Sequence, residues 1–370
     1  MLNRQVGSWF MSRRNLFLLF YSLGIVFVIC LFLGTILLFD GRTMYDWSKR
    51  MLAPQSTQHA SIMDMPTQIP VTPSASMTAA PTPVCGGPPR MILVLIGTDS
   101  RSDTYNAGLA DSIRLVRVDF VDPGIMILPF QRDIYVEIPG IAKHGITHGK
   151  LNQAYTYGTP AFGYYDAPNQ GLGLMELAME YNFGVHVDNG VVINMQSFAR
   201  IVDTLGGIDV YLPYTIDGRV KGSKDADLYF EAGYHHLNGR RVQILARLRP
   251  NGDIERTNVQ TIILQALGAR LLSPTILPEL PELVNTFQNS VYTDLDPVQI
   301  TQLTCLAAKL DPQKVAYVNF PEEIFQGTRV QDPVLGYTFV WDVDFTVLRS
   351  YIASFVNGTW PDISLSTPVP

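Results

Sequence analysis

Short apolar runs bounded by polar residues are the first pattern in the folded part of the chain. Three of them cover Met91–Gly97, Ile113–Phe120 and Ile125–Phe130, and an Asp-Pro-Gly turn sequence at 122–124 separates the last two. Runs of this length, rich in β-branched residues and bounded by turn residues, are typical of β-strands. Two further runs, Gly190–Met195 and Ile208–Leu212, predict two more strands.

Apolar residues at helical spacing lie between and after these runs. The predicted helices cover Asn169–Phe183, Ser197–Leu205, a segment from the cap residue Asn238 through Arg247, and a segment that begins at the cap residue Asp253. Two more helices are expected after residue 275, the second capped at 296. The order of strands and helices favours an α/β fold with a mixed central sheet flanked by helices on both faces.

One apolar run is too long for a strand. Leu16–Phe39 has 24 positions, counted from 16 through 39, and contains no charged residue. At about 1.5 Å per residue it can cross a ~30 Å hydrocarbon core, so we predict a single membrane anchor. The lysine and arginine counts on its two sides are equal. The short tail before it and the long polar segment after it favour an orientation with the N-terminus on the cytoplasmic side of the membrane and the folded domain on the outer side.

Changes of composition divide the chain into segments. We predict a cytoplasmic tail (1–15), the transmembrane anchor (16–39), a linker rich in Pro, Thr and Ser (40–89), the main α/β domain (90–272), a helical C-terminal extension packed on it (273–358), and a disordered tail (359–370). The linker composition buries too little apolar surface to offset the entropy of ordering. Such a linker suits a domain that works near a membrane surface.

Overall composition excludes some classes of partner. Hydrophobic residues make up 47% of the chain, which allows a sizeable core, and the net charge of −6 does not support a nucleic-acid partner. Of the three cysteines, Cys30 lies in the predicted anchor. Cys85 and Cys305 could form one disulfide in an oxidising compartment or remain two buried thiols, and the sequence leaves both open.

Charged residues gather where the predicted strands begin and end. Asp99 follows the first run, Asp111 precedes the second, and Arg132 and Asp133 follow the third. Three arginines follow within a short later stretch: Arg247, Arg249 and Arg256. Carboxylates suit Mg²⁺, and guanidinium groups suit phosphate oxygens. The pattern therefore indicates a site for an anionic, phosphate-bearing substrate.

An ordered set of short motifs resembles the LytR-CpsA-Psr family of cell-envelope enzymes. The motifs are IGTDSR (96–101), LADS (109–112), PFQRD (129–133), KLNQAY (150–155), DTLGGIDVYLP (203–213), LNGRRVQILARLR (237–249) and DIERTNVQ (253–260). Each motif is weak alone, but the complete ordered set after one N-terminal span is specific. The resemblance covers residues 90–272.

This resemblance implies a fold, an activity and a set of site residues. The fold would be α/β with an apolar lipid pocket. The protein would be a membrane-anchored phosphotransferase that moves a glycopolymer from a polyprenyl diphosphate carrier to peptidoglycan. Asp99 and Asp111 would bind Mg²⁺. Asp99 or Asp133 would orient or deprotonate the acceptor hydroxyl, and Asp99 is favoured because the resemblance places it at the metal. The other catalytic residues would be Arg132, Arg247 and Arg249. The substrate-binding residues would be Arg101, Arg114, Asp133, Lys150, Asn152, Arg256 and Gln260.

Two positions depart from the family pattern, which usually has arginine where this chain has Leu109 and Val259. Two positive charges near the diphosphate are therefore missing, and Arg101 and Arg114 are close enough in sequence to replace them. The departures keep two alternative functions open. One is a non-catalytic scaffold that binds polyprenyl lipid or wall polymer, and the other is a polyprenyl pyrophosphatase that uses water as the acceptor.

Purely structural ion pairs would explain part of the same pattern. Arg132 is adjacent to Asp133, and Arg256 follows Asp253 by about one helical turn. The functional interpretation requires more than such pairs. It requires the carboxylates and guanidinium groups to gather around one space the size of a diphosphate.

Overall fold

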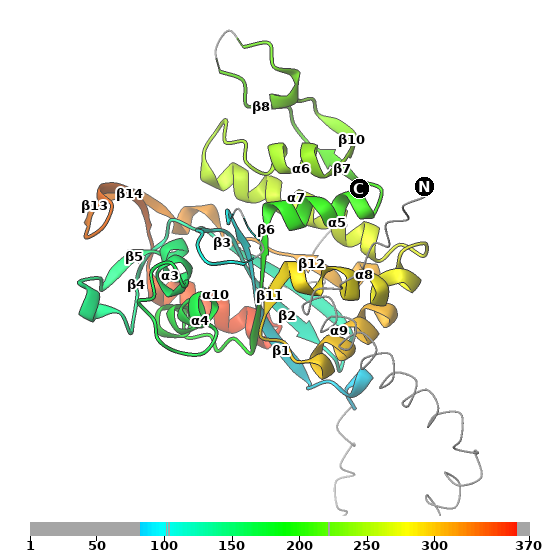
Figure 1. Cartoon of the computed structure of the whole chain (residues 1–370), viewed down its shortest axis with the longest axis horizontal. Helices are drawn as coiled ribbons and strands as arrows, with labels where there is room; N and C mark the ends of the chain where they lie inside the picture. The colour runs from blue at the N-terminus through cyan, green and yellow to red at the C-terminus, as the bar shows by residue number, and fades with distance from the viewer. Residues whose placement is uncertain (1–81, 101, 103, 221–222, 361–370) are drawn as a thin grey trace, which may run out of the picture. The chain divides into compact units, whose positions relative to one another are not determined.

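A six-stranded sheet with strand order β11-β6-β1-β2-β3-β12 is the centre of the structure (Figure 1). The computed structural model describes residues 82–360 except 101, 103 and 221–222. The strands are β1 (Arg90–Thr98), β2 (Ala110–Asp119), β3 (Gly124–Phe130), β6 (Asn189–Asn194), β11 (Val291–Thr293) and β12 (Val315–Tyr317).

The sheet is mixed, as the sequence predicts. β2 pairs antiparallel with both β1 and β3, whereas β6 runs parallel to β1 and β12 runs parallel to β3. β11 pairs antiparallel with β6 at one edge. The three predicted apolar runs are therefore neighbours in the middle of the sheet.

Three helices cover one face of this sheet (Figure 1). They are α3 (Leu151–Gly158), α4 (Gln170–Phe183) and α10 (Phe345–Asn357). Leu172 of α4 and Leu348 of α10 are fully buried in one core with Ile113 and Leu115 of β2. Alternate residues of β2 face this core, as expected for the period of a strand.

Four helices lie on the other face of the sheet, where further apolar side chains pack together. They are α5 (Met195–Thr204), α7 (Asp253–Leu271), α8 (Leu280–Phe287) and α9 (Pro297–Lys309). Leu306 of α9 packs on Met91 and Leu93 of β1. A separate core joins α5 and α7 to α6 (Gly239–Leu245) and β7 (Ile208–Leu212).

Four pairs of short strands lie outside the central sheet in the described part of the chain. They are β4 (Tyr135–Glu137) with β5 (His148–Lys150), β7 with β10 (Gly233–Leu237), β8 (Ile216–Asp217) with β9 (Tyr229–Phe230), and β13 (Gln326–Asp332) with β14 (Gly336–Asp342).

The helix ends agree with the sequence in part. The Asn238 side chain caps α6 by accepting a hydrogen bond from the backbone N–H of Arg241, but α6 ends at Leu245, so the prediction of a helix through Arg247 is wrong. α7 begins at Asp253 with Gly252 as its cap residue, so Asp253 is not the cap. At α9 the expected cap is confirmed at residue 296, within a capping box.

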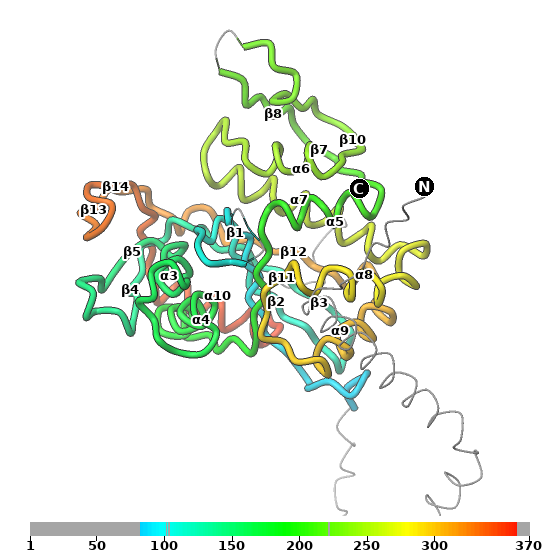
Figure 2. The backbone as a smooth tube through the Cα atoms, viewed as in Figure 1, coloured from blue at the N-terminus to red at the C-terminus, as the bar shows by residue number. Residues whose placement is uncertain are grey.

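The C-terminal segment (273–358) contains strands as well as helices, so the prediction of a helical extension is wrong. β11 and β12 belong to it, and they form the two edges of the central sheet. Figure 2 follows this segment from yellow to red through β11, β12, the β13–β14 hairpin and α10. A three-residue strand is too short to show a periodic pattern, which explains why neither edge strand was predicted.

A disulfide bond joins Cys85 to Cys305 of α9. The cysteine pair that the sequence left open is therefore oxidised in this structure. The predicted anchor (16–39), most of the linker (40–81) and nearly all of the predicted tail (361–370) lie outside the described residues. Within the described residues, no helix has the length and apolar character that a membrane span requires.

Candidate functional site

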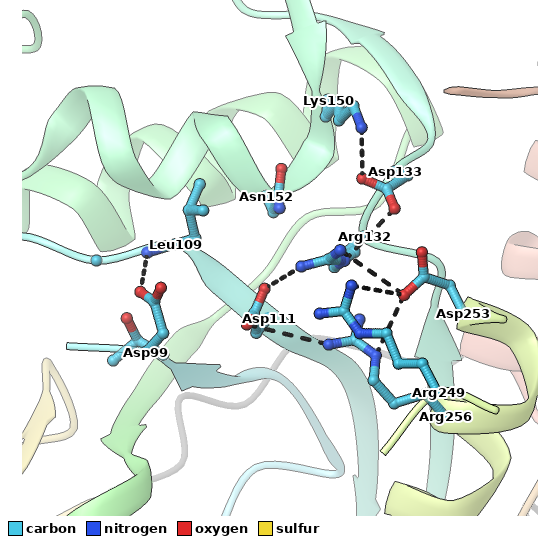
Figure 3. Close-up of polar contacts among 12 residues, drawn as sticks. Asp99, Leu109, Asp111, Arg132, Asp133, Lys150, Asn152, Arg249, Asp253 and Arg256 are labelled. Atoms are coloured by element: carbon cyan, nitrogen blue, oxygen red, sulfur yellow. Dashed lines mark hydrogen bonds and ion pairs between the residues drawn. The ribbon is translucent and has the colours of Figure 1, made fainter. Parts of the chain in front are cut away.

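Charged side chains from separate parts of the chain meet at one end of β2 and β3 (Figure 3). Because β2 and β3 are antiparallel, the start of one strand lies beside the end of the other, with Ile113 opposite Phe130. This register brings Asp111 and Arg132 together, as the sequence predicts. We call the group the charged cluster; it consists of Asp111, Arg132, Asp133, Lys150, Arg249, Asp253 and Arg256.

Asp253 is the centre of the charged cluster, a role that the sequence did not predict. Its Oδ1 atom lies 3.3 Å from Nε of Arg256, 3.6 Å from Nη1 of Arg249 and 3.7 Å from Nη2 of Arg132. This oxygen has no hydrogen-bond partner among the described residues. The three guanidinium groups therefore keep donors for another anion. Asp253 lies four residues after Arg249 and three before Arg256, and this helical spacing was the signal in the sequence that could have indicated the two ion pairs.

Asp111 connects the charged cluster to a polar cavity. Its Oδ1 atom accepts a 2.5 Å hydrogen bond from Nη1 of Arg132, and its Oδ2 atom lies 4.0 Å from Nη1 of Arg256. Asp111 also lines a polar cavity of about 440 Å³ together with Asp99 and Arg247. The two predicted metal ligands and one predicted catalytic arginine therefore border the same space.

Asp99 is exposed and directly follows β1. Its Oδ1 atom accepts a 2.6 Å hydrogen bond from the backbone N–H of Leu109. This contact uses only the backbone of Leu109, so it does not depend on the side chain at that position. Gln196 and Gln243, which the sequence analysis did not select, line the same polar cavity.

Asp133 is held by two cations in a buried setting. It is 3% exposed, its Oδ1 atom lies 3.0 Å from Nζ of Lys150, and its Oδ2 atom lies 3.4 Å from Nε of Arg132. Burial raises the pKa of Asp133 in spite of these two cations. This geometry agrees with the structural interpretation of the Arg132–Asp133 pair.

The charged cluster as a whole contains four cationic side chains and three carboxylates. Burial, with the nearby charges of Arg132 and Arg249, lowers the pKa of Arg256 to about 10. Burial also acts to lower the pKa of Arg132, but its carboxylate neighbours Asp133, Asp111 and Asp253 raise that pKa above the ordinary value. A bound phosphate would neutralise part of this charge.

An apolar cavity of about 310 Å³ adjoins the polar one, and Met195 lines both. The apolar cavity lies between β1, β2 and β6 on one side and α5 and α7 on the other. Its lining includes Leu95, Val191, Ile193, Phe198, Ile201, Ile263 and Leu264. A further apolar cavity of about 470 Å³ shares Val191, Ile201 and Val291 with it. The polar cavity and the two apolar cavities are thus neighbours that share lining residues.

The other predicted site residues lie in different settings. Arg114 and Gln260 line the apolar cavity, and the buried Asn152 lies at the start of α3. Arg101 lies outside the described residues. Val259 is 2% exposed and packs in the core that joins α7 to β7, where an arginine would be buried among apolar side chains.

A family model and several known proteins match this chain. The family model described as the LytR_cpsA_psr family matches residues 83–342. The chain is 25% identical over 215 residues to "Regulatory protein MsrR" of Staphylococcus aureus (strain COL), covering 58% of this chain and 59% of that protein. It is 26% identical over 213 residues to "Polyisoprenyl-teichoic acid--peptidoglycan teichoic acid transferase TagU" of Bacillus mycoides (strain KBAB4), covering 56% and 61%. The matches therefore span about three fifths of the length of these relatives.

A solved structure supports the fold independently. The crystal structure of Bacillus subtilis TagV superposes on this chain with a TM-score of 0.55 at 21% sequence identity, covering 72% of this chain and 97% of that one. Similarity at this level of identity shows that the two proteins share the mixed α/β fold.

Proposed function

This chain belongs to the LytR_cpsA_psr family, and we propose that it is a membrane-anchored transferase that moves a glycopolymer from a polyprenyl diphosphate carrier to peptidoglycan. One observation carries the proposal. The guanidinium group of Arg247 and the carboxylates of Asp99 and Asp111 line a polar cavity, Asp111 also pairs with Arg132 of the charged cluster, and an apolar cavity shares the lining residue Met195 with the polar one. This combination suits an anionic diphosphate attached to a long hydrocarbon.

The residues at the polar cavity fit Mg²⁺. Two carboxylates, of Asp99 and Asp111, line the cavity, and in the described part of the chain no group of three or more His, Cys, Asp or Glu residues could hold a metal ion. Mg²⁺ is commonly bound by one or two carboxylates while water and substrate phosphates supply the other ligands. When bound, Mg²⁺ would neutralise negative charge on the diphosphate.

The side chains of the site would position the substrate and receive a proton. Arg132, Arg249 and Arg256 would donate hydrogen bonds to the phosphate oxygens and hold the phosphorus for attack. The acceptor hydroxyl oxygen forms a bond to the phosphorus that carries the glycopolymer. The phosphoanhydride bond breaks, polyprenyl phosphate leaves with the bonding electrons, and the hydroxyl proton passes to the carboxylate of Asp99.

Turnover by the purified full chain tests this proposal. We expect the chain, given a polyprenyl diphosphate-linked glycan, a peptidoglycan acceptor and Mg²⁺, to release polyprenyl phosphate and label the acceptor. Asp99→Asn and Arg249→Met should each lower the rate by 100-fold or more, roughly the loss seen when one transition-state contact is removed. The exposed Arg329→Met on β13 is the matched control and should not change the rate.

Each alternative function predicts a different result. Release of polyprenyl phosphate at an equal rate without peptidoglycan would indicate a pyrophosphatase. Binding of the carrier lipid without turnover at any Mg²⁺ concentration would indicate a scaffold. Either result would contradict the proposed transferase.

A further inference from the structure

Aromatic side chains that the proposed reaction leaves without a role gather beside the charged cluster. They come from β4 and β5, from the segment that joins these two strands, from the end of α3 and from the segment that follows α3 (Figure 1). We call them the ring cluster; it consists of Tyr135, His144, His148, Tyr157, Phe162 and Tyr164.

The rings of this cluster contact one another in defined orientations. The His144 and Tyr164 rings are stacked, with their centroids 4.2 Å apart and their planes at 15°. Phe162 meets Tyr164 edge-on at 5.5 Å and Tyr157 edge-on at 5.7 Å. Stacked and edge-on pairs of this kind are favourable, so they hold the ring faces in place.

Two of the rings are open to solvent, and the ring beneath them is fixed. Phe162 is 42% exposed, and His144 is exposed at one end of its stack. Tyr157 is 2% exposed, and its hydroxyl oxygen accepts a 2.7 Å hydrogen bond from Nε2 of Gln153. Exposed ring surface on a rigid support is favourable to cover, which suits a binding surface.

The ring cluster adjoins the charged cluster through the β4–β5 pair. Tyr135 lies directly opposite Lys150 in the register of these strands, and the His148 ring stacks on Tyr135 with the centroids 5.9 Å apart. Lys150 belongs to the charged cluster through its ion pair with Asp133 at 3.0 Å. One end of the ring cluster therefore meets the proposed phosphate site.

Hydrogen bonds also join the ring-bearing segment to the segment that holds Asp99. The backbone N–H of Ala161 donates to the backbone oxygen of Asn106 at 2.9 Å, and the Thr156 hydroxyl donates to that of Gly108 at 2.8 Å. The residue after Gly108 donates its backbone N–H to the carboxylate of Asp99. A chain-like molecule lying on the rings could thus extend to the carboxylate that would take the acceptor proton.

The composition around the rings favours an uncharged ligand. Residues 156–165 contain no charged side chain, and residues 144–149 contain no ionisable side chain other than their two histidines. A polyanion would find no lysine or arginine in these two segments. A sugar ring presents a face of C–H groups with partial positive charge, which packs on the negative face of an aromatic ring, while its hydroxyl groups remain in water.

We propose that the ring cluster binds the glycan of the acceptor, with sugar rings packed on Phe162 and on the exposed face of the His144–Tyr164 stack. This inference rests on the proposed function for the identity of the acceptor and deepens it by assigning the acceptor a binding surface. These rings would bind the acceptor and take no part in the chemistry. Their loss should therefore raise the KM for the acceptor and leave kcat unchanged.

Saturation-transfer NMR titration of the full chain tests this inference, with an uncharged tetramer of N-acetylglucosamine as the probe. Phe162→Leu keeps an apolar side chain and removes the ring, so it should weaken binding about fivefold. Phe162→Trp restores a ring and should bind as tightly as wild type. Tyr234→Ala is the matched control, because Tyr234 is 77% exposed on β10, outside the ring cluster, and binding should not change.

A second variant covers the possibility that Phe162→Leu disturbs its segment. His144 is exposed, so His144→Ala should keep the thermal midpoint of the wild type and weaken binding about threefold. Unchanged affinity in both folded variants would overturn the inference. So would an equal loss of affinity in Tyr234→Ala, or a wild-type chain that does not bind the tetramer.

The outcomes separate this inference from the proposed function. Ring-dependent binding of the tetramer without any transfer in the turnover assay would remove the transferase and keep the glycan site. Normal transfer with an unchanged acceptor KM in Phe162→Leu would remove only the inference.

Discussion

Replacing Asp253 with asparagine should make the protein less stable and its anion site stronger. The substitution keeps the size of the side chain and removes the negative charge that three guanidinium groups share. Arg256 is affected most, because its side chain is only 3% exposed. The one carboxylate left near it would be that of Asp111, whose Oδ2 atom lies 4.0 Å from Nη1 of Arg256.

The size of the stability loss follows from burial. Removing one partner of a buried ion pair costs about 3–5 kcal/mol, because the other charge is left uncompensated. The Asp253 side chain keeps 18% of its surface exposed. Solvent therefore screens part of the interaction, and we expect the free energy of unfolding to fall by about 2–3 kcal/mol.

The gain in anion affinity follows from Coulomb's law. A phosphate bound by the arginines would no longer be repelled by the Asp253 carboxylate. At an effective dielectric constant of about 20, a unit charge at about 7 Å contributes about 2 kcal/mol. Salt screening reduces this to about 1 kcal/mol, so inorganic pyrophosphate should bind about fivefold more tightly.

Two measurements on the same protein test both effects. Urea denaturation followed by tryptophan fluorescence gives the free energy of unfolding, and isothermal titration calorimetry gives the pyrophosphate affinity. Asp217→Asn is the matched control, because Asp217 forms an exposed ion pair with Arg219 at 2.8 Å, and neither quantity should change. Unchanged stability in Asp253→Asn, or weaker pyrophosphate binding, would refute the assigned role of Asp253.

Three further predictions concern the rest of the fold. Burial and the charge of Asp294 raise the pKa of Glu176 from 4.5 to about 8. The folded protein therefore keeps a proton that the unfolded chain releases between these pH values, and stability falls as pH rises from 4.5 to 8. Glu176→Gln should abolish this slope and raise the unfolding free energy at pH 8 by on the order of 3 kcal/mol, which urea titrations at pH 5 and pH 8 would check. Reducing the Cys85–Cys305 disulfide, which joins residues 220 positions apart, should lower that free energy by about 2–4 kcal/mol, and an equal urea midpoint with and without dithiothreitol would contradict this. Asp296→Ala removes the capping box of α9 and should cost about 1 kcal/mol, seen as a lower thermal midpoint by circular dichroism.

The middle of the fold could be predicted because its signals are local. β1, β2 and β3 are long enough to show apolar runs with turn residues between them, and α5 and α7 show helical spacing. The edge strands β11 and β12 have three residues each, so their pairing depends on the sheet that is already present.

The charged cluster could be predicted only as a set of residue types. Strand ends indicated that Asp111 and Arg132 would meet, and the register of β2 and β3 confirms this. The spacing of Asp253 indicates its pairs with Arg249 and Arg256, but its contact with Arg132 depends on how the start of α7 lies against that strand end, which no local pattern records. Likewise, the sequence does not indicate that Arg114 is buried. Apolar and polar residues alternate around it on β2 as in an ordinary strand with one exposed face.

The bond between Cys85 and Cys305 also determines how the domain would respond to a mechanical load. Cys85 comes five residues before β1, and its partner belongs to a helix that packs on the sheet. Tension applied to the chain ahead of Cys85 would be transmitted covalently into α9. It would not peel β1 away from its two neighbours in the sheet, so the domain could be pulled from that side without opening the apolar cavity beside β1.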